Sequence, residues 1–396
     1  MAFEDRRTDH PLPPTDVPAD VTADVIESAP AAESRRQRRG RRFWREWGYL
    51  VALGLAFALG ILAGVVRLPY AIMTPGPPTD VLADHKVDGK DVPRIVVTGK
   101  PTYPTSGSLD FTTVQVRGGP GYPVNAVDVL RAWLDPNQDV YPVEDLFPPQ
   151  ATSEQIEQEN KAEMVGSQQE AAAVALRALG YDVPQVVSIG AVAKDAPSGT
   201  ALRQGDVLVS IGGAPATDSA AVRAAIQAVP VGQAAEVVVV RDGSQQTVQA
   251  TTGRSADGRT VLGIILRRDY RLPVQVTVDA GNVGGPSAGT MFALGIYDKL
   301  TDGAMTGGQQ IAGTGTIDDQ GRVGPIGGIP QKMAGARQAG IHWFLAPADN
   351  CDEVVGREPD GLRVVKVATF ADARAAVEAI GQGRGDALPQ CTKAAG

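Results

Sequence analysis

Ser287 lies in a segment whose composition suits a nucleophile. The segment, 281–290, reads GNVGGPSAGT, follows an alternating strand pattern at 274–278 and precedes an apolar run at 291–297. A serine between glycines at the entry to a helix exposes its hydroxyl, and small neighbours let a substrate backbone approach. Free N–H groups of the first helical turn can then hold an oxyanion. The same composition is typical of a plain helix start with Ser287 as N-cap, so both interpretations stay open on this segment alone.

A histidine base for Ser287 has weak support. Gly285-x-Ser287-x-Gly289 formally matches the nucleophile elbow of the α/β-hydrolases, which needs a histidine downstream. Only His342 is available, and it lies in the apolar run 340–345, which predicts a buried strand instead of a catalytic loop. The HGGG-type oxyanion motif of those enzymes is absent as well. A Ser–His esterase therefore remains a subordinate hypothesis.

Lys332 is the other candidate base. It follows a glycine-rich stretch, 321–328, and the pattern predicts that it opens a helix running to residue 339. A lysine in the first turn of a helix opposes the helix dipole, and burial there lowers its pKa further. A neutral amine is what a Ser–Lys mechanism requires. Taken alone, an isolated lysine is more often a solvated surface charge.

Four motifs, taken in order, resemble the proteolytic domain of Lon proteases. They are Gly285-Pro286-Ser287-Ala288-Gly289, then Thr314-Gly315, then Gly321-x-Val323-x-Pro325-Ile326-Gly327-Gly328-Ile329-x-x-Lys332, and then Ala339-Gly340-Ile341. Upstream, the helix pattern at 164–176 resembles the first helix of that domain, and 107–116 resembles its opening strand. The resemblance implies an α+β fold and serine endopeptidase activity.

The resemblance also assigns roles. It makes Ser287 the nucleophile and Lys332 the general base, with the Thr314 hydroxyl beside the lysine and Gly285, Pro286 and Ala288 as supporting residues. Two features depart from the family pattern: no G-x-x-x-x-G-K-[ST] nucleotide motif occurs, and glycines 284 and 285 stand where many Lon sequences carry an acidic residue. We therefore expect ATP-independent cleavage of unfolded or membrane-delivered polypeptides, with no cofactor and no metal. Lon-like peptidases tend to form rings, so a homo-oligomeric ring is implied.

Residues 181–258 have a different pattern of predicted elements and resemble a bacterial PDZ domain. The pattern predicts a strand at 186–189, a helix at 218–229 capped by Thr217, and a hairpin of 236–240 with 247–251. The run Ala196-Pro197…Leu202…Gly205-Asp206-Val207-Leu208…Ile211-Gly212-Gly213 carries the resemblance. It implies that an extended chain end binds between that strand and that helix. The implied peptide-binding residues are Gly180, Tyr181, Val187, Ile189 and Val222, although these apolar side chains also suit a plain small core.

An uncharged stretch at 47–66 predicts a transmembrane helix. Its twenty residues match the ~30 Å hydrocarbon core of a bilayer, and 35–46 carries seven arginines. Arginines on one flank hold that flank in the cytoplasm, which predicts an extracytoplasmic catalytic part in the cell membrane. A twin-arginine or other export signal is the competing interpretation.

Composition excludes several classes of function. Residues 1–46 carry nine basic and nine acidic side chains, so the whole net charge of -8 lies after residue 66, and nucleic acid is not an expected partner. Three histidines and two cysteines are too few for a His-based or Cys-rich metal site. Outside the cytoplasm Cys351 and Cys391 are disulfide candidates; two free thiols are the alternative.

The expected order of parts is as follows: a disordered cytoplasmic tail (1–46), a transmembrane helix (47–67), an extended linker (68–104), the first part of the Lon-like domain (105–180), a PDZ-like insertion (181–258), the second Lon-like part (259–385) and a tail (386–396). A non-catalytic PDZ scaffold with an inactive peptidase fold is the rival hypothesis. The joint presence of Ser287, Thr314 and Lys332 argues against it.

Overall fold

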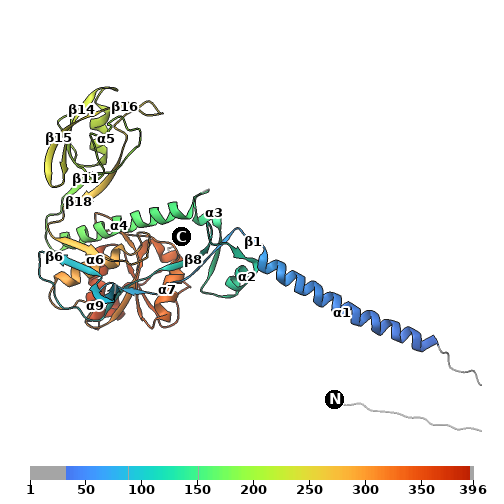
Figure 1. Ribbon diagram of the computed structural model, residues 1–396. Helices are drawn as coiled ribbons and strands as arrows, with labels where there is room; N and C mark the ends of the chain where they lie inside the picture. The colour runs from blue at the N-terminus through green and yellow to red at the C-terminus, as the bar shows by residue number, and fades with distance from the viewer. Residues whose placement is uncertain (1–32, 88, 150, 393–396) are drawn as a thin grey trace, which may run out of the picture. The chain divides into compact units, whose positions relative to one another are not determined.

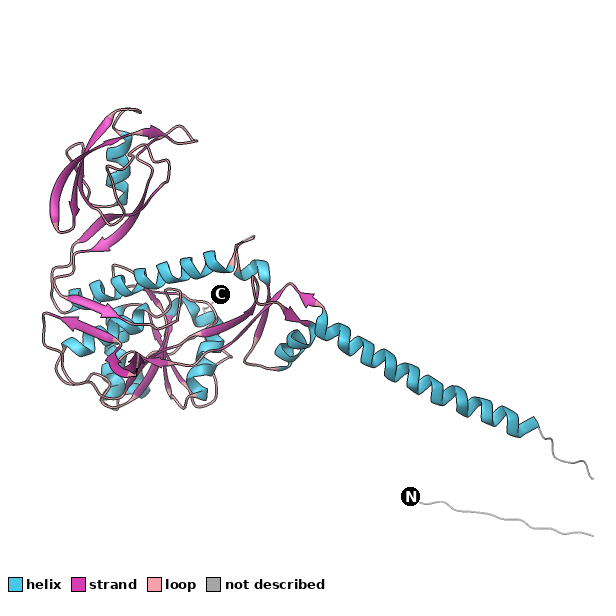
Figure 2. Ribbon diagram, viewed as in Figure 1, coloured by secondary structure: helices cyan, strands magenta, loops and turns pink. Residues whose placement is uncertain are grey.

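The computed structural model describes residues 33–87, 89–149 and 151–392, with an α+β arrangement of helices and strands (Figures 1 and 2). The α+β fold class predicted from the sequence is confirmed.

A five-stranded sheet forms the framework of the region that holds Ser287 and Lys332. Its strand order is β24-β23-β20-β7-β3, and only β3 is antiparallel to its neighbour. The strands are β3 (Thr79–Asp80), β7 (Ser108–Phe111), β20 (Gln310–Gly313), β23 (Trp343–Pro347) and β24 (Arg363–Val367). A mainly parallel sheet is covered on both faces, so alternate residues of each strand enter different cores.

Helices cover the two faces of this sheet. Leu109 and Ile311 pack into a core with α4 (Ser153–Ala178), α6 (Gly289–Leu300) and α9 (Phe370–Gly381). Ala312 and Phe344 point into a second core with α7 (Ile329–Gln338) and α8 (Cys351–Val354). The sheet therefore separates α6 from α7, and both helices begin near the carboxyl ends of the parallel strands.

The predicted extended linker at 68–104 is wrong. This part of the chain forms β1 (Arg67–Leu68), β2 (Tyr70–Pro75), β3, β4 (Asp84–Val87), β5 (Lys90–Pro93) and β6 (Ile95–Thr98). Ile72 and Val81 are fully buried, and β6 pairs with β19 (Gln275–Val278). The strands are only two to six residues long and are separated by prolines. The sequence therefore shows no alternating apolar pattern long enough to predict them.

The single strand predicted at 107–116 is two strands in different sheets. After β7, the chain turns at Thr112 and Thr113 into β8 (Val114–Gly118), which joins the sheet β10-β2-β8. The elements that complete this region are β9 (Val124–Asn125), α2 (Ala126–Leu134), β10 (Asp139–Pro142) and α3 (Val143–Leu146).

The PDZ region is built on the sheet β15-β14-β12-β11-β18, with β13 on β12. The elements are β11 (Gln185–Val192), β12 (Val207–Ile211), β13 (Ala214–Pro215), α5 (Ser219–Gln227), β14 (Ala234–Arg241), β15 (Ser244–Thr251), β16 (Gly253–Arg254), β17 (Thr260–Val261) and β18 (Ile264–Tyr270). The sheet continues beyond the predicted boundary at 258, because β18 pairs with β11 along its whole length. The N-cap of α5 is Asp218 and not Thr217; its carboxylate accepts the Ala220 and Ala221 N–H groups.

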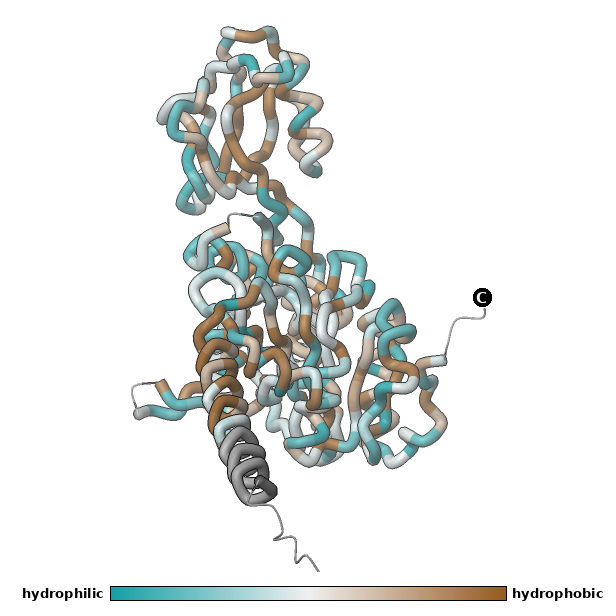
Figure 3. Tube along the Cα trace, turned by 90° about the vertical axis from the view of Figure 1, so that its right-hand side faces the viewer, coloured by the Kyte–Doolittle hydropathy of each residue, from teal (hydrophilic) through white to brown (hydrophobic). Residues whose placement is uncertain are grey.

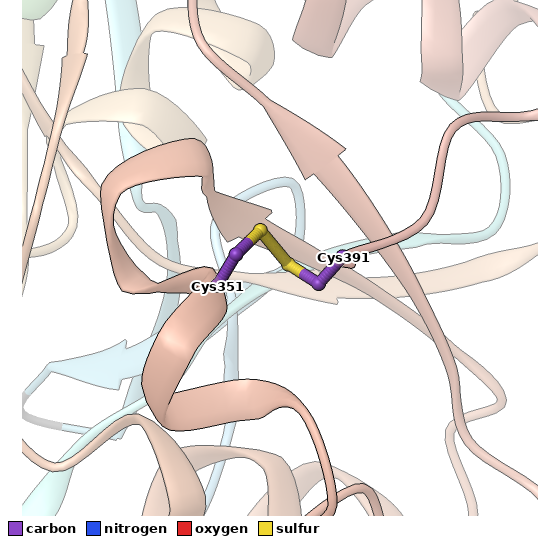
Figure 4. Close-up of a disulfide and its surroundings, with 2 residues drawn as sticks. All are labelled: Cys351 and Cys391. Carbon is purple, nitrogen blue, oxygen red and sulfur yellow. A yellow bond between two sulfur atoms is a disulfide. The ribbon is translucent and has the colours of Figure 1, made fainter. Parts of the chain in front are cut away.

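The predicted carboxyl-terminal tail is tied to the fold as far as the structure describes it. A short 3₁₀ helix, Gly385–Ala387, precedes a bridge between Gln390 and Val365 of β24. A disulfide joins Cys391 to Cys351, the first residue of α8 (Figure 4). Residues 393–396 lie outside the described residues.

The first helix is longer than predicted. Helix α1 spans Glu33–Val65, so 33–46 are helical and the predicted disorder is wrong for them; 1–32 lie outside the described residues. Its part Trp47–Val65 is long and apolar enough to cross a membrane (Figure 3). The arginine-rich segment has good helix formers, which let the helix extend beyond the apolar stretch.

Candidate active site

Ser287 stands on a turn just before α6 and is held from two sides. The N-cap of α6 is Ala288 without a side-chain cap, so the interpretation of Ser287 as an ordinary N-cap is wrong. On one side the Gly285 N–H donates to the Asn160 carbonyl at 2.9 Å, and the Ser167 hydroxyl donates to the Pro286 carbonyl at 3.0 Å. Helix α4 thus clamps the residues that precede the serine.

On the other side, the segment after β20 holds the serine backbone. The Gly315 N–H and the Thr314 hydroxyl both donate to the Ser287 carbonyl, at 2.8 and 3.0 Å, and the Thr290 N–H donates back to the Gly315 carbonyl at 3.1 Å. Gly315 has φ +145°, and a side chain there would meet Val323 and the Thr290 hydroxyl. This position therefore requires glycine.

Lys332 lies in the first turn of α7 and points at Ser287. Its Nζ is 2.8 Å from Ser287 Oγ and 3.0 Å from Thr314 Oγ1, while the residue as a whole is 2% exposed. The N-cap of α7, Gly328, has φ +70°, and a Cβ there would collide with Met73 of β2. The tight start of α7 brings the lysine down onto the serine turn across the end of the sheet.

Burial decides the charge of Lys332. Desolvation lowers the pKa of its amine from 10.5 to about 7, because an ammonium loses its hydration in this enclosed position. Close to half of the amines are therefore neutral at neutral pH. The alternative of a solvated surface lysine is wrong for this residue, since it is 2% exposed.

The Thr314 hydroxyl fixes the direction of the amine. Because its own proton is donated to the Ser287 carbonyl, its oxygen can only accept, and it accepts an N–H from Lys332. A neutral amine that donates toward Thr314 keeps its lone pair for the Ser287 hydroxyl. This arrangement can move a proton from serine to lysine.

Two backbone donors beside Ser287 are free within the described part of the chain. The Gly289 and Thr290 N–H groups are used by Pro286 and Gly315, whereas those of Ser287 and Ala288 donate to no acceptor there. Free N–H groups at the start of a helix are suited to an oxyanion. The free N–H donors thus belong to the two residues that precede α6 and not to the first turn of that helix.

His342 lies away from this site, at the opposite end of the sheet. It is exposed, precedes β23, and its Nδ1 is 3.1 Å from the Gly361 carbonyl, so the prediction of a buried strand residue is wrong. The register places it opposite Gln310, the first residue of β20, and Thr314 lies four residues further along, just after that strand. At ~3.3 Å per residue that is ~13 Å along the strand, so the histidine is out of reach of Ser287.

The predicted peptide groove of the PDZ region is also wrong. Val187, Ile189 and Val222 are fully buried in its core, and β11 is paired on both edges, with β12 and β18. Gly180 and Tyr181 follow the end of α4, where Tyr181 packs on the small core around Leu176 and Val183. An inner strand has no free backbone groups with which to pair a peptide.

The sequence reasoning missed two groups of residues. Asn160 and Ser167 of α4 were not recognised as holding the serine turn, and polar residues on a helix give no local signal for such a role. The other group is strand β18, which within the described residues has β11 on one edge and no strand on the other. The sequence did carry a signal for β18: Gly263 comes directly before the apolar residues that begin the strand at Ile264, and a glycine before an apolar run suits a strand after a tight turn.

Comparison with known proteins gives two family matches. Residues 263–372 match the Lon protease (S16) C-terminal proteolytic domain, and residues 161–252 match the PDZ domain. Both resemblances drawn from the motifs are thereby confirmed.

Individual relatives match over short stretches. Lon protease 1 of Thermus thermophilus is 40% identical over 87 residues, which cover 22% of this chain and 11% of the relative. The Lon protease of Aquifex aeolicus is 36% identical over 104 residues, which cover 26% of this chain and 13% of the relative. The chain thus spans little more than a tenth of the length of these Lon proteases.

Among solved structures, the PDZ domain of the SdrC-like protein of Listeria monocytogenes is 21% identical to this chain. The match covers 20% of this chain and 85% of that chain, with a TM-score of 0.19.

Proposed function

From the premise that this chain carries a Lon-type proteolytic domain and a PDZ domain, we propose that it is a membrane-anchored serine endopeptidase that works without ATP. The observation that carries the proposal is the buried Lys332 amine, 2.8 Å from the Ser287 hydroxyl and with a pKa lowered to about 7. A lysine with an ordinary pKa would remain protonated and could not serve as a base.

The geometry supports the following mechanism. Neutral Lys332 accepts the Ser287 proton as Oγ attacks the scissile carbonyl, and the N–H groups of Ser287 and Ala288 stabilise the oxyanion. The Lys332 ammonium then protonates the leaving amine, which departs and leaves an ester on Ser287. Water, deprotonated by the neutral amine, hydrolyses this ester and restores the serine.

The PDZ region recruits substrate in this proposal, through the open edge of β18 and not beside β11. An extended polypeptide can add there as a further strand, because the outer backbone groups of β18 have no strand partner within the described residues. Helix α5 contacts β18, so the added segment would lie between them. Unfolded or membrane-delivered polypeptides are the expected substrates.

The first helix and the disulfide support the proposed location. Residues 47–65 lie in the bilayer, and the arginines at 35–46 keep the amino terminus in the cytoplasm. The catalytic part is then extracytoplasmic, where the Cys351–Cys391 bond persists and ATP is absent. Assembly into a homo-oligomeric ring, implied by the resemblance, completes the proposal.

The mechanism is tested by hydrolysis of an unstructured fluorogenic peptide by the full chain in detergent. We expect no turnover in Ser287→Ala and none in Lys332→Arg, since a guanidinium stays protonated. His342→Ala, the matched control, should retain activity. Full activity in Lys332→Arg with none in His342→Ala would transfer the proposal to a Ser–His hydrolase. Inactivity of the unmodified chain on unfolded substrates would favour the scaffold hypothesis.

The recruitment proposal has its own test. Gln185 and Tyr270 are paired neighbours on antiparallel strands, so residues 186–269 can be replaced by an Asn-Gly turn. This deletion should spare hydrolysis of the short peptide and reduce hydrolysis of full-length unfolded proteins. Equal loss of both activities would mean that the PDZ region has a structural role only.

The topology is tested with protease added to spheroplasts. Cleavage after residue 70 with protection of the amino-terminal tail is expected. Protection of the catalytic part would contradict the proposed orientation.

A further inference from the structure

Helix α2 exposes an apolar face. Leu130, Trp133 and Leu134 are 56%, 67% and 78% exposed, and their spacing of three and four residues places them on one side of the helix. Tyr122, just before the helix, is 72% exposed. A group of large apolar side chains in water marks a binding surface.

This face is not needed to hold α2 in place. The helix already buries Val129 and Ala132 in a small core with Ile72 of β2 and Val124 of β9. Its amino terminus is closed by a capping box, in which Asn125 and Asp128 bond to each other's backbone N–H. The helix is therefore well supported on one side, whereas an ordinary surface helix would carry polar residues on the other.

The chain path keeps α2 close to the end of the candidate membrane span. The span ends at Val65, Arg67 is paired with Asn125 across β1 and β9, and Asn125 is the N-cap of α2. Two residues of chain reach at most ~7 Å, and an antiparallel pair adds ~5.5 Å. The start of α2 therefore lies within about 13 Å of the last residue of the span, whatever the direction of helix α1.

The residue types match a lipid headgroup region. Trp and Tyr, which have an apolar body and a polar edge, concentrate at that level of a bilayer, and leucines reach the acyl chains below it. Arg67 and Arg131 are exposed on the paired strand and on the helix, where they suit phosphate groups. The acidic residue of the helix, Asp128, is engaged in the cap.

We propose that the apolar face of α2 docks onto the bilayer surface at which the membrane span ends. The docking residues are Leu130, Trp133 and Leu134, with Tyr122 just before the helix. This inference rests on the proposed membrane anchor. The docked helix holds β2 and β10 against the membrane. Because β2 packs on α7, which carries Lys332, the active site is kept near polypeptides that emerge from the bilayer.

The test measures the depth of Trp133 in the full chain reconstituted in phosphatidylcholine vesicles. The chain has four tryptophans, so replacing three of them by phenylalanine leaves single-tryptophan chains that retain Trp47, Trp133 or Trp343. Lipids brominated at different positions along the acyl chain quench tryptophan emission at matching depths. Trp343 in the central sheet is the negative control and Trp47 at the start of the span is the positive control.

We expect Trp133 to lose emission with lipids brominated near the headgroup and less with lipids brominated near the chain end. Trp343 should be unaffected. Quenching of Trp47 without quenching of Trp133 would overturn the docking while leaving the anchor intact. If neither Trp47 nor Trp133 is quenched, the anchor is overturned as well. Blue-shifted, unquenched Trp133 emission that depends on protein density would assign this face to a second copy, and so also overturn the proposal.

The effect of polar substitution provides a second measurement. Leu130→Gln with Leu134→Gln should shift the Trp133 emission to the red and lower its quenching, without changing the emission of Trp343. Because both leucines are exposed, the fold should tolerate these changes. Unchanged quenching of Trp133 in this variant would contradict docking through the α2 face.

Discussion

Replacing Lys332 by methionine should abolish catalysis and stabilise the protein at neutral pH. The amine is 2% exposed and its pKa falls from 10.5 to about 7 on folding, so folding must remove a proton from it. Methionine has a similar length, fits an enclosed position and carries no charge to desolvate. Turnover should fall by a factor on the order of 10³ or more, because the variant lacks the base.

The sign and size of the stability change follow from proton linkage. Between pH 7 and 10.5 the unfolded state binds a proton at Lys332 that the folded state does not, so the native protein gains stability as the pH rises. The cost of deprotonation is about 4 kcal/mol at pH 7 and about 1 kcal/mol at pH 10. Losing the hydrogen bonds to Ser287 and Thr314 costs the variant about 2 kcal/mol. We therefore expect Lys332→Met to be more stable by about 2 kcal/mol at pH 7 and less stable by about 1 kcal/mol at pH 10.

The assay is urea unfolding followed by tryptophan emission, at both pH values, beside peptide hydrolysis. Lys161→Met is the matched control, because the Lys161 side chain is 71% exposed on α4 and should show no such reversal. At each pH the measured quantity is the stability of Lys332→Met minus that of the native chain. If this difference is lower at pH 7 than at pH 10, the lowered pKa of Lys332 is refuted. The same result would refute the proposed role of Lys332 as the general base.

Three further predictions concern neighbouring features. Thr314→Val should lower kcat about 10- to 100-fold with little change in KM, because the amine loses its orienting acceptor; an unchanged kcat would contradict this role. Burial raises the pKa of Asp110 from 3.8 to about 6, so the native chain should lose up to about 3 kcal/mol between pH 4 and 6 as the pH rises. Asp110→Asn should remove that loss in unfolding measurements, and an unaltered pH profile would count against it. Cys351→Ser opens a bond between residues 40 positions apart and should destabilise the chain by about 2–4 kcal/mol in thermal unfolding. Cys391→Ser should do the same, and the double variant should be no worse than either.

The sequence was most informative where one short segment carries its own chemistry. Ser287 between small residues, Lys332 after a glycine-rich turn and Thr314 before Gly315 could all be found without a structure, because the spacing of small residues reflects tight turns. The resemblance to the Lon proteolytic domain rested on those same local motifs, and the resemblance to PDZ domains rested on the separate run at 196–213. The long apolar run of the first helix is equally local, since one bilayer thickness sets its length.

Contacts between distant residues were decided only by the tertiary structure. Within the described residues β18 is an edge strand because its one strand partner is β11, about 75 positions away along the chain. Neither strand's sequence indicates which of the two lies at the edge. The sequence predicted His342 inside a buried strand. In the structure it precedes β23, and the parallel register puts it at the opposite end of the sheet from Thr314, which follows β20.

The charge state of Lys332 was decided in the same way. Its sequence neighbours allow a solvated ammonium, whereas the packing of α7 onto the serine turn removes water and lowers its pKa. Desolvation depends on every atom that surrounds a group, and most of those atoms come from elsewhere in the chain. Local motifs are therefore enough to identify Ser287 and Lys332 as the catalytic pair, while the reactivity of the pair is a property of the folded protein.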